Sequence, residues 1–225
     1  MRKTRMSIAL LAGAVSCVLV ASTAVAATIT GTDRGEHLVG TNRPDTIYAR
    51  GGSDRVDGLA GGDLVYAGWG HDRVRAGDGD DVVYGGWGAD RLFGGTGNDT
   101  QYGGPGNDVI LANMGVDHSY GGPGNDRLWA LARGDVHPGP NGEVDTVGDT
   151  VDGGPGNDRI HTRDGEVDTV ACGDGYDVAF LDKVDVISDA TPQSPDGSCE
   201  VVKRADPKPS DAASEPDAGP GNTGQ

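Results

Sequence analysis

A nine-residue repeat runs without a gap through the middle of this chain. From Gly31 to Trp129 the sequence divides into eleven consecutive nonapeptides, among them GGTGNDTQY, GGPGNDVIL and GGPGNDRLW. The sixth residue is acidic in all eleven, and the eighth is aliphatic in nine, with Gln101 and Ser119 as the exceptions. Because so short a unit cannot enclose a core of its own, each copy must stack on its neighbours. The repeat therefore predicts a solenoid.

A second period, of 18 residues, lies on top of the first. The even-numbered repeats all end in tyrosine, and most odd-numbered repeats carry arginine at position seven. The tyrosines are Tyr48, Tyr66, Tyr84, Tyr102 and Tyr120, and the arginines are Arg55, Arg73, Arg91 and Arg127. Residues that match every 18 but not every nine should lie above one another. One coil is thus predicted to contain two nonapeptides, with the tyrosines and arginines on opposite sheets and Gln101 beside Ser119.

Each nonapeptide is predicted to form one short strand and one turn. Positions seven to nine alternate so that the aliphatic side chain points inward. Positions one to six make the turn, where glycine supplies backbone conformations closed to other residues. With 40 glycines, two phenylalanines and 35% apolar residues, the chain can bury only a thin core. The expected fold is all-β, with two parallel sheets.

The stacked acidic residues require a counter-charge. Acids one layer, about 4.8 Å, apart repel by roughly 1 kcal/mol in water and several times more at intermediate dielectric. A hard divalent cation between successive turns would replace this repulsion with a net attraction. Carboxylate and backbone carbonyl oxygens suit Ca²⁺, which takes six to eight oxygen ligands, better than Mg²⁺. The lack of clustered cysteine or histidine argues against zinc and copper.

The motif GGxGxD followed by x-U-x, where U is a large aliphatic residue, resembles the haemolysin-type calcium-binding nonapeptide of the RTX proteins. The resemblance covers residues 31–129 closely and 153–180 partly. It implies a right-handed parallel β-roll with several Ca²⁺ ions held between turns. The ligands that it implies are Asp54, Asp63, Asp72, Asp81, Asp90, Asp99, Asp108, Asp117, Asp126 and Asp158. In the first two repeats Arg34 and Arg43 replace a glycine and Glu36 replaces aspartate, so these repeats are expected to cap the roll and bind weakly.

The first 26 residues are predicted to be a secretory signal peptide, with a basic start, an apolar middle and a small-residue cleavage site at residues 24–26. Lipid attachment at Cys17 is the competing interpretation, although the residues before it are a poor lipid-attachment sequence. No later stretch approaches the roughly 18 apolar residues that span a bilayer. The protein is therefore expected to be secreted, without a membrane span.

The mature chain is predicted to have three parts. Residues 27–180 form the β-roll with an insertion at 130–152, residues 181–204 form a closing segment, and residues 205–225 form a disordered tail rich in Pro, Gly and acids. The hexapeptide GEVDTV occurs at 142–147 and again at 165–170. After signal cleavage only Cys172 and Cys199 remain, and in an oxidising compartment they are expected to form a disulfide.

Charge and motifs narrow the functional classes. Removal of residues 1–26 takes three of the 18 basic residues and none of the 35 acidic ones, so the net charge changes from −17 to −20. Such a chain repels nucleic acid and attracts cations. The sequence has no GxSxG, HExxH or GxxxxGK motif, and an amino-terminal signal is atypical of RTX toxins and proteases, so their activities are not carried over.

Three functional hypotheses remain. The preferred one is a non-enzymatic, secreted calcium-binding module whose folding is driven by Ca²⁺. The second is an adhesion module that binds a cell-surface glycan or protein through the tyrosine-lined face. The third is an enzyme with an unrecognised active site in the insertion.

Overall fold

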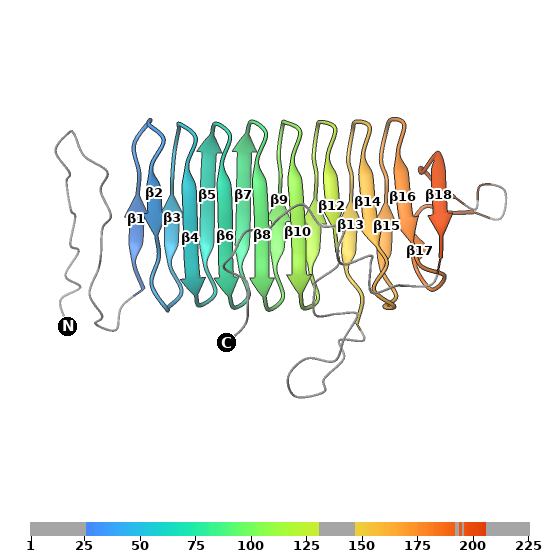
Figure 1. The fold of residues 1–225 in the computed structure, drawn as a ribbon, viewed down its shortest axis with the longest axis horizontal. Helices are drawn as coiled ribbons and strands as arrows, with labels where there is room; N and C mark the ends of the chain where they lie inside the picture. Colours follow the sequence, from blue (N-terminus) through green and yellow to red (C-terminus); the bar gives the residue numbers. More distant parts are fainter. Residues whose placement is uncertain (1–25, 131–146, 192–193, 195, 206–225) are drawn as a thin grey trace.

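The fold is a stack of β-coils along one long axis (Figure 1). The computed structural model describes residues 26–130, 147–191, 194 and 196–205. Within these residues eighteen strands form two nine-stranded sheets, and every strand pairing is parallel. Successive strands alternate between the sheets, so each coil contributes one strand to each. The predicted all-β parallel roll is confirmed.

The two sheets are named here for their repeated residues. The tyrosine sheet comprises β1 (Thr28–Thr30), β3 (Thr46–Tyr48), β5 (Leu64–Trp69), β7 (Val82–Trp87), β9 (Thr100–Tyr102), β11 (His118–Tyr120), β13 (Thr150–Asp152), β15 (Thr169–Ala171) and β17 (Val186–Ile187). The arginine sheet comprises β2 (His37–Val39), β4 (Arg55–Ala60), β6 (Arg73–Asp78), β8 (Arg91–Thr96), β10 (Val109–Met114), β12 (Arg127–Trp129), β14 (Arg159–Thr162), β16 (Val178–Leu181) and β18 (Val201–Arg204). In the described residues no helix is long and apolar enough to cross a membrane.

The strand register confirms the coil of 18 residues. Tyr66 pairs with Tyr48 and Tyr84 in the tyrosine sheet. Arg73 pairs with Arg55 and Arg91 in the arginine sheet. The two polar exceptions also meet: Ser119 lies opposite Gln101, and the Ser119 hydroxyl donates to Gln101 Oε1 at 3.4 Å. The sequence period thus reports directly which side chains share a layer.

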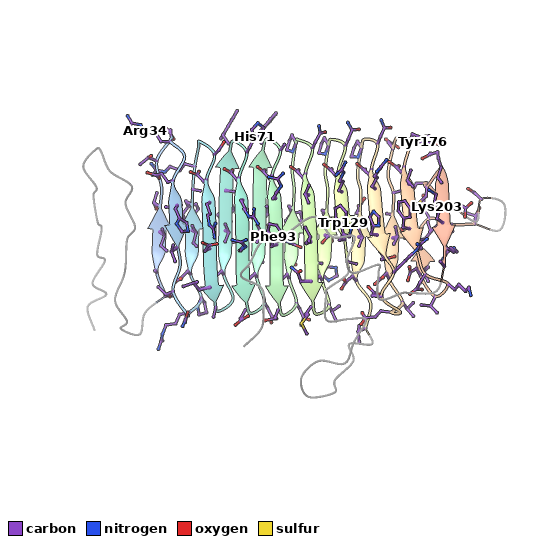
Figure 2. All side chains as sticks on the ribbon, viewed as in Figure 1. Arg34, His71, Phe93, Trp129, Tyr176 and Lys203 are labelled. Atoms are coloured by element: carbon purple, nitrogen blue, oxygen red, sulfur yellow. A yellow bond between two sulfur atoms is a disulfide. The ribbon has the colours of Figure 1, made fainter. Side chains whose placement is uncertain are left out.

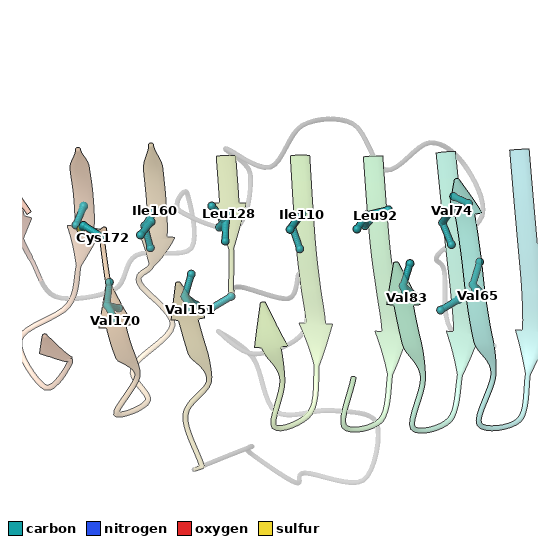
Figure 3. Close-up of a cluster of buried hydrophobic side chains, with 14 of the residues drawn as sticks. Val65, Val74, Val83, Leu92, Ile110, Leu128, Val151, Ile160, Val170 and Cys172 are labelled. Carbon is teal, nitrogen blue, oxygen red and sulfur yellow. The ribbon is translucent and has the colours of Figure 1, made fainter. Parts of the chain in front are cut away.

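The core is a narrow column of aliphatic side chains between the sheets. Figure 3 shows position-eight residues such as Val65, Val83 and Leu92 pointing inward from their strands. They are fully buried, as is the small residue at position one of several repeats, for example Ala67. Burying one such valine or leucine contributes about 1.5–3 kcal/mol, so the column stabilises every coil by a similar small amount.

The arginine sheet departs from the expected alternation at position nine. Phe93, Leu111 and Trp129 were expected to face outward, yet they are buried and pack together as a second cluster. A ring stack begins at Trp129 and runs through His161 to Phe180, with centroids 4.9 and 4.5 Å apart. Apolar side chains in adjacent layers cover one another even on the outer face of a sheet. The alternation of inward and outward side chains along one strand does not predict this burial.

The carboxyl-terminal part of the roll is more regular than expected. Thr150–Asp152 was assigned to the insertion, but it forms β13 and pairs with β11 and β15. The closing segment supplies β17 and β18, which extend both sheets. Cys172 and Cys199 form the predicted disulfide, with Cα atoms 5.2 Å apart. Residues 1–25 of the expected signal peptide, residues 131–146 and residues 206–225 of the expected tail lie outside the described residues.

The tyrosine stack leads to a first prediction. Tyr84 lies between Tyr66 and Tyr102, with centroids 5.0 and 4.9 Å away and interplanar angles of 5°. Each stacked pair is worth about 0.5–1.5 kcal/mol, and 1 kcal/mol shifts the melting temperature of a chain this size by about 2–4 °C. Tyr84→Ser should therefore lower the melting temperature in saturating Ca²⁺, measured by circular dichroism, by several degrees.

The matched control is Tyr176→Ser, because Tyr176 lies on an exposed turn with 59% of its surface accessible. This variant should melt close to the wild type. Equal melting temperatures for the two variants would contradict the contribution assigned to the stack.

Candidate metal centre

Position six of the repeats forms two files of carboxylates, one along each edge of the roll. The arginine-edge file, at the turns leading into the arginine sheet, comprises Glu36, Asp54, Asp72, Asp90, Asp108, Asp126, Asp158, Asp177 and Glu200. The tyrosine-edge file, at the other turns, comprises Asp45, Asp63, Asp81, Asp99, Asp117, Asp149, Asp168 and Asp185. In Figure 2, Arg34, His71 and Tyr176 mark the arginine edge, along the top of the roll. All ten aspartates predicted from sequence lie in these files.

One hydrogen bond repeats along each file and orients every carboxylate. The backbone N–H of Asp72 donates to Asp90 Oδ1 at 2.8 Å, and the N–H of Asp90 donates to Asp108 Oδ1 at 2.8 Å. The backbone carbonyl of Asp72 accepts from the N–H of Arg91, also at 2.8 Å. Each acid is therefore part of the sheet ladder, and its Oδ1 completes the backbone pairing between coils.

The second carboxylate oxygen, Oδ2, has no such role. In nine of the ten predicted aspartates Oδ2 is buried without a hydrogen-bond partner: Asp54, Asp63, Asp72, Asp81, Asp90, Asp99, Asp108, Asp126 and Asp158. Asp117 occupies the equivalent place, with its Oδ1 accepting from the Asp99 N–H at 2.7 Å. A buried carboxylate oxygen without a donor is costly. Rows of such oxygens, all of the hard type, fit a hard cation such as Ca²⁺.

The glycines of the turns bring backbone close to these oxygens. A Cβ built on Gly94 would collide with Asp99 Oδ2, so a larger residue at Gly94 would displace this carboxylate. Gly88 has φ +135°, and a Cβ there would collide with the carbonyl oxygen of Gly70 in the coil before it. Side chains are thus excluded where the turns approach one another and the carboxylates.

The first coil is built differently. Both carboxylate oxygens of Glu36 accept from Thr32, one from its N–H at 2.7 Å and one from its hydroxyl at 3.0 Å. In the next repeat the Thr41 N–H donates to Asp45 Oδ2 at 2.6 Å. These acids are satisfied inside their own turns, which is the physical reason to expect weak cation binding there.

Comparison with known families agrees with this geometry. The pattern described as the RTX calcium-binding nonapeptide repeat matches four times, over residues 30–65, 66–101, 102–128 and 146–179. The chain belongs to the RTX calcium-binding nonapeptide-repeat family. No curated protein matches it. The fourth match begins before Asp149 and so includes a coil that the glycine pattern alone had left in the insertion.

Sequence reasoning missed five acids of this RTX roll: Asp149, Asp168, Asp177, Asp185 and Glu200. Asp168 and Asp177 share the buried, unpartnered Oδ2 of the regular repeats. The register was hidden because consecutive members of a file are 32 residues apart at Asp117 and Asp149, and 19 apart at Asp149 and Asp168. An acid followed two residues later by an aliphatic residue, as in Asp168-Thr169-Val170, is the signal that could have found them.

Burial and mutual repulsion alter the acidity of the files. Burial, together with repulsion from Asp117, raises the pKa of Asp99 to about 9. Burial, with repulsion from Asp126 and Asp90, raises the pKa of Asp108 to about 8. The pKa of Asp63 rises to about 7, mainly through burial. In the metal-free RTX roll these acids therefore favour the protonated form over much of the neutral range.

These pKa values predict that acid stabilises the metal-free roll. The folded pKa values lie above the ordinary value of 3.8, so the stabilisation is complete below pH 3.8 and is lost as the pH rises through about 7 to 9. Protein stripped of metal and transferred to metal-free buffer should show more β-structure by circular dichroism at pH 4–5 than at pH 8. Asp99→Asn, which keeps an Oδ1 acceptor and removes the charge, should reduce this dependence. Loss of β-structure on acidification would contradict the prediction.

Proposed function

We propose that this RTX roll is a secreted protein that binds several Ca²⁺ ions, that the ions drive its folding, and that its role is structural and not catalytic. The observation that carries the proposal is the repeated buried Oδ2 without a hydrogen-bond donor. The family match supports calcium as the ion. The disulfide between Cys172 and Cys199 fits an oxidising, extracellular compartment.

The proposed ligands are position-six aspartates of the two files. From the sequence these are Asp54, Asp63, Asp72, Asp81, Asp90, Asp99, Asp108, Asp117, Asp126 and Asp158, and Asp177, whose Oδ2 is also buried without a donor, is a further candidate. The glycine-rich turns would contribute backbone carbonyl oxygens. When bound, Ca²⁺ supplies the positive charge that offsets repulsion along each file.

Calcium binding of this kind is coupled to folding. The files exist only when coils are stacked, because each carboxylate is oriented by an N–H from the neighbouring coil. Ions that bind only the folded chain add their binding free energy to folding. Extracellular calcium modules commonly have dissociation constants of about 10⁻⁴ to 10⁻³ M, which suits the compartment proposed here.

This function predicts a calcium-dependent folding transition. Circular dichroism should show little β-structure in chelator at pH 7.5 and a cooperative gain of β-structure in millimolar Ca²⁺. Asp90→Asn, in the middle of a file, should raise the calcium midpoint several-fold, because it removes a charge at an otherwise unpartnered oxygen. Glu36→Gln is the matched control and should shift the midpoint little, since Thr32 already satisfies that carboxylate. A spectrum that chelator leaves unchanged would refute the proposal.

Adhesion through aromatic side chains is the second candidate. The stacked tyrosines present mainly ring edges, since neighbouring rings cover one another at interplanar angles of 2–8°. The observation that favours adhesion is instead Trp69 and Trp87, which stack at 5.5 Å and remain 66% and 57% exposed. Exposed aromatic rings of this size mark binding surfaces for glycans or proteins.

A glycan array separates this candidate from a purely structural role. Under the adhesion hypothesis the calcium-loaded protein binds one class of glycan, Trp69→Ala abolishes binding, and Tyr84→Ala tests the tyrosine face in parallel. Absence of binding to any glycan would remove the carbohydrate version. The third hypothesis, an active site in the insertion, concerns residues that lie mostly outside the described part of the chain.

A further inference from the structure

The turn between β14 and β15 differs from the other turns of the roll. The repeat TRDGEVDTVA, residues 162–171, has ten residues where the regular repeats have nine. It lacks the paired glycines at its start and places Asp164 and Glu166 ahead of the file member Asp168. The turn lies in the yellow-to-orange part of the stack, near the carboxyl-terminal end of the roll (Figure 1).

Three carboxylates converge at this turn. One ligand oxygen from each of Asp164, Glu166 and Asp168 lies within 4.8 Å of the other two. All three side chains are buried, with 8%, 8% and 0% of their surfaces exposed. Such a group of like charges is strongly self-repelling away from solvent.

The hydrogen bonding of Asp168 also points to a ligand at this turn. Its Oδ1 accepts from the Asp149 N–H at 2.6 Å, which orients the carboxylate as elsewhere in the file. Its Oδ2 is buried and has no hydrogen-bond partner. A fully buried carboxylate oxygen without a donor, on a residue that belongs to a group of three buried carboxylates, is explained by a bound cation.

The next turn holds this one in place through carboxylates that are already occupied. Asp182 Oδ2 accepts from the Gly165 N–H at 2.9 Å. Asp185 Oδ2 accepts from the Thr162 hydroxyl at 2.6 Å and from the Asp182 N–H at 2.8 Å. These contacts fix the shape of the lengthened turn, so the folded roll holds the three converging acids together.

The adjacent arginine is committed elsewhere. The Arg163 guanidinium donates to the carbonyl oxygen of Leu181 at 3.2 Å and to that of Lys203 at 2.8 Å. It also lies 5.6 Å from the centroid of the Phe180 ring. These contacts fasten Arg163 to β16 and β18 in the arginine sheet.

We propose that Asp164, Glu166 and Asp168 form a calcium site of a different kind, in which three side-chain carboxylates take the place of the glycine-rich turn. The proposal goes beyond calcium binding by the nonapeptides and needs from it only that the roll is folded. Ca²⁺ tolerates irregular oxygen coordination, whereas Mg²⁺ demands a near-ideal octahedron, so the irregular turn suits calcium. Affinity for Ca²⁺ rises with the number of charged ligands, so this site binds more tightly than sites with fewer carboxylates.

Calorimetric titration of the metal-free, full-length chain with CaCl₂ tests the site. The wild type should show one tight equivalent resolved from the weaker nonapeptide sites. Glu166→Gln removes one of the three charges at nearly constant shape and should weaken that equivalent about tenfold or more, without changing the weaker class. Asp164→Asn should act in the same direction.

Asp174→Asn is the matched control, because Asp174 is an exposed acid in the turn of the following repeat. It should titrate like the wild type, and circular dichroism in saturating Ca²⁺ establishes that each variant is folded. Identical titrations for wild type, Glu166→Gln and Asp174→Asn would overturn this site while leaving the nonapeptide sites intact. The titration could also show one tightly bound Ca²⁺ that depends on Glu166 while circular dichroism shows that folding does not depend on calcium. That result would support this site and refute calcium-driven folding.

Discussion

The roll depends on the different roles of the two carboxylate oxygens of each position-six aspartate. One oxygen completes the backbone ladder by accepting an N–H from the preceding coil, as Asp108 Oδ1 does from Asp90. This requirement forces the carboxylates into file, one per layer, and leaves the second oxygen buried without a donor. The same contact that aligns the coils therefore also concentrates negative charge along both edges. The structure needs protons or cations there because of how it is built, and not as an added feature.

The thin core makes this charge balance more consequential than it would be in an ordinary domain. Each layer buries one position-eight side chain from each sheet, for example Val65 from the tyrosine sheet and Val74 from the arginine sheet. Small residues at position one are buried with them. That amount of apolar burial offsets only part of the conformational entropy lost by nine ordered residues per strand and turn. Ring stacking adds a similar small increment in each layer, from Tyr48 through Tyr120. No single layer is stable alone, so the stack gains stability through repetition.

Much of this architecture could be predicted from the sequence, because in a solenoid residues that are one period apart lie next to each other in adjacent coils. The pairing of Gln101 with Ser119 followed from the 18-residue spacing alone, and the structure confirms it. The acids of the irregular coils could not be placed in the same way, since Asp149 and Asp168 follow segments whose length breaks the count. The burial of Leu111 was also missed, because it depends on packing against Phe93 and Trp129 in the neighbouring layers and not on alternation within one strand. The convergence of Asp164 with Asp168 required the path of a ten-residue turn, which composition does not specify.

The two ends of the roll are closed by different chemistry, and this has a consequence for how the files behave. At the amino-terminal end, Thr32 and Thr41 satisfy the first acids with N–H and hydroxyl donors. At the carboxyl-terminal end, the Cys172–Cys199 disulfide joins the last regular repeat to the segment before β18, and Glu200 ends the arginine-edge file by accepting from the Asp177 N–H. The first acids, Glu36 and Asp45, have donors for both carboxylate oxygens, whereas the interior carboxylates keep a buried Oδ2 without a donor. Because each interior carboxylate is oriented by its neighbour, an ion bound at one layer also fixes the N–H and carboxylate that define the next. Cation binding by the nonapeptides should consequently be cooperative along each file and weakest at the amino-terminal end, where Thr32 and Thr41 already satisfy the first acids.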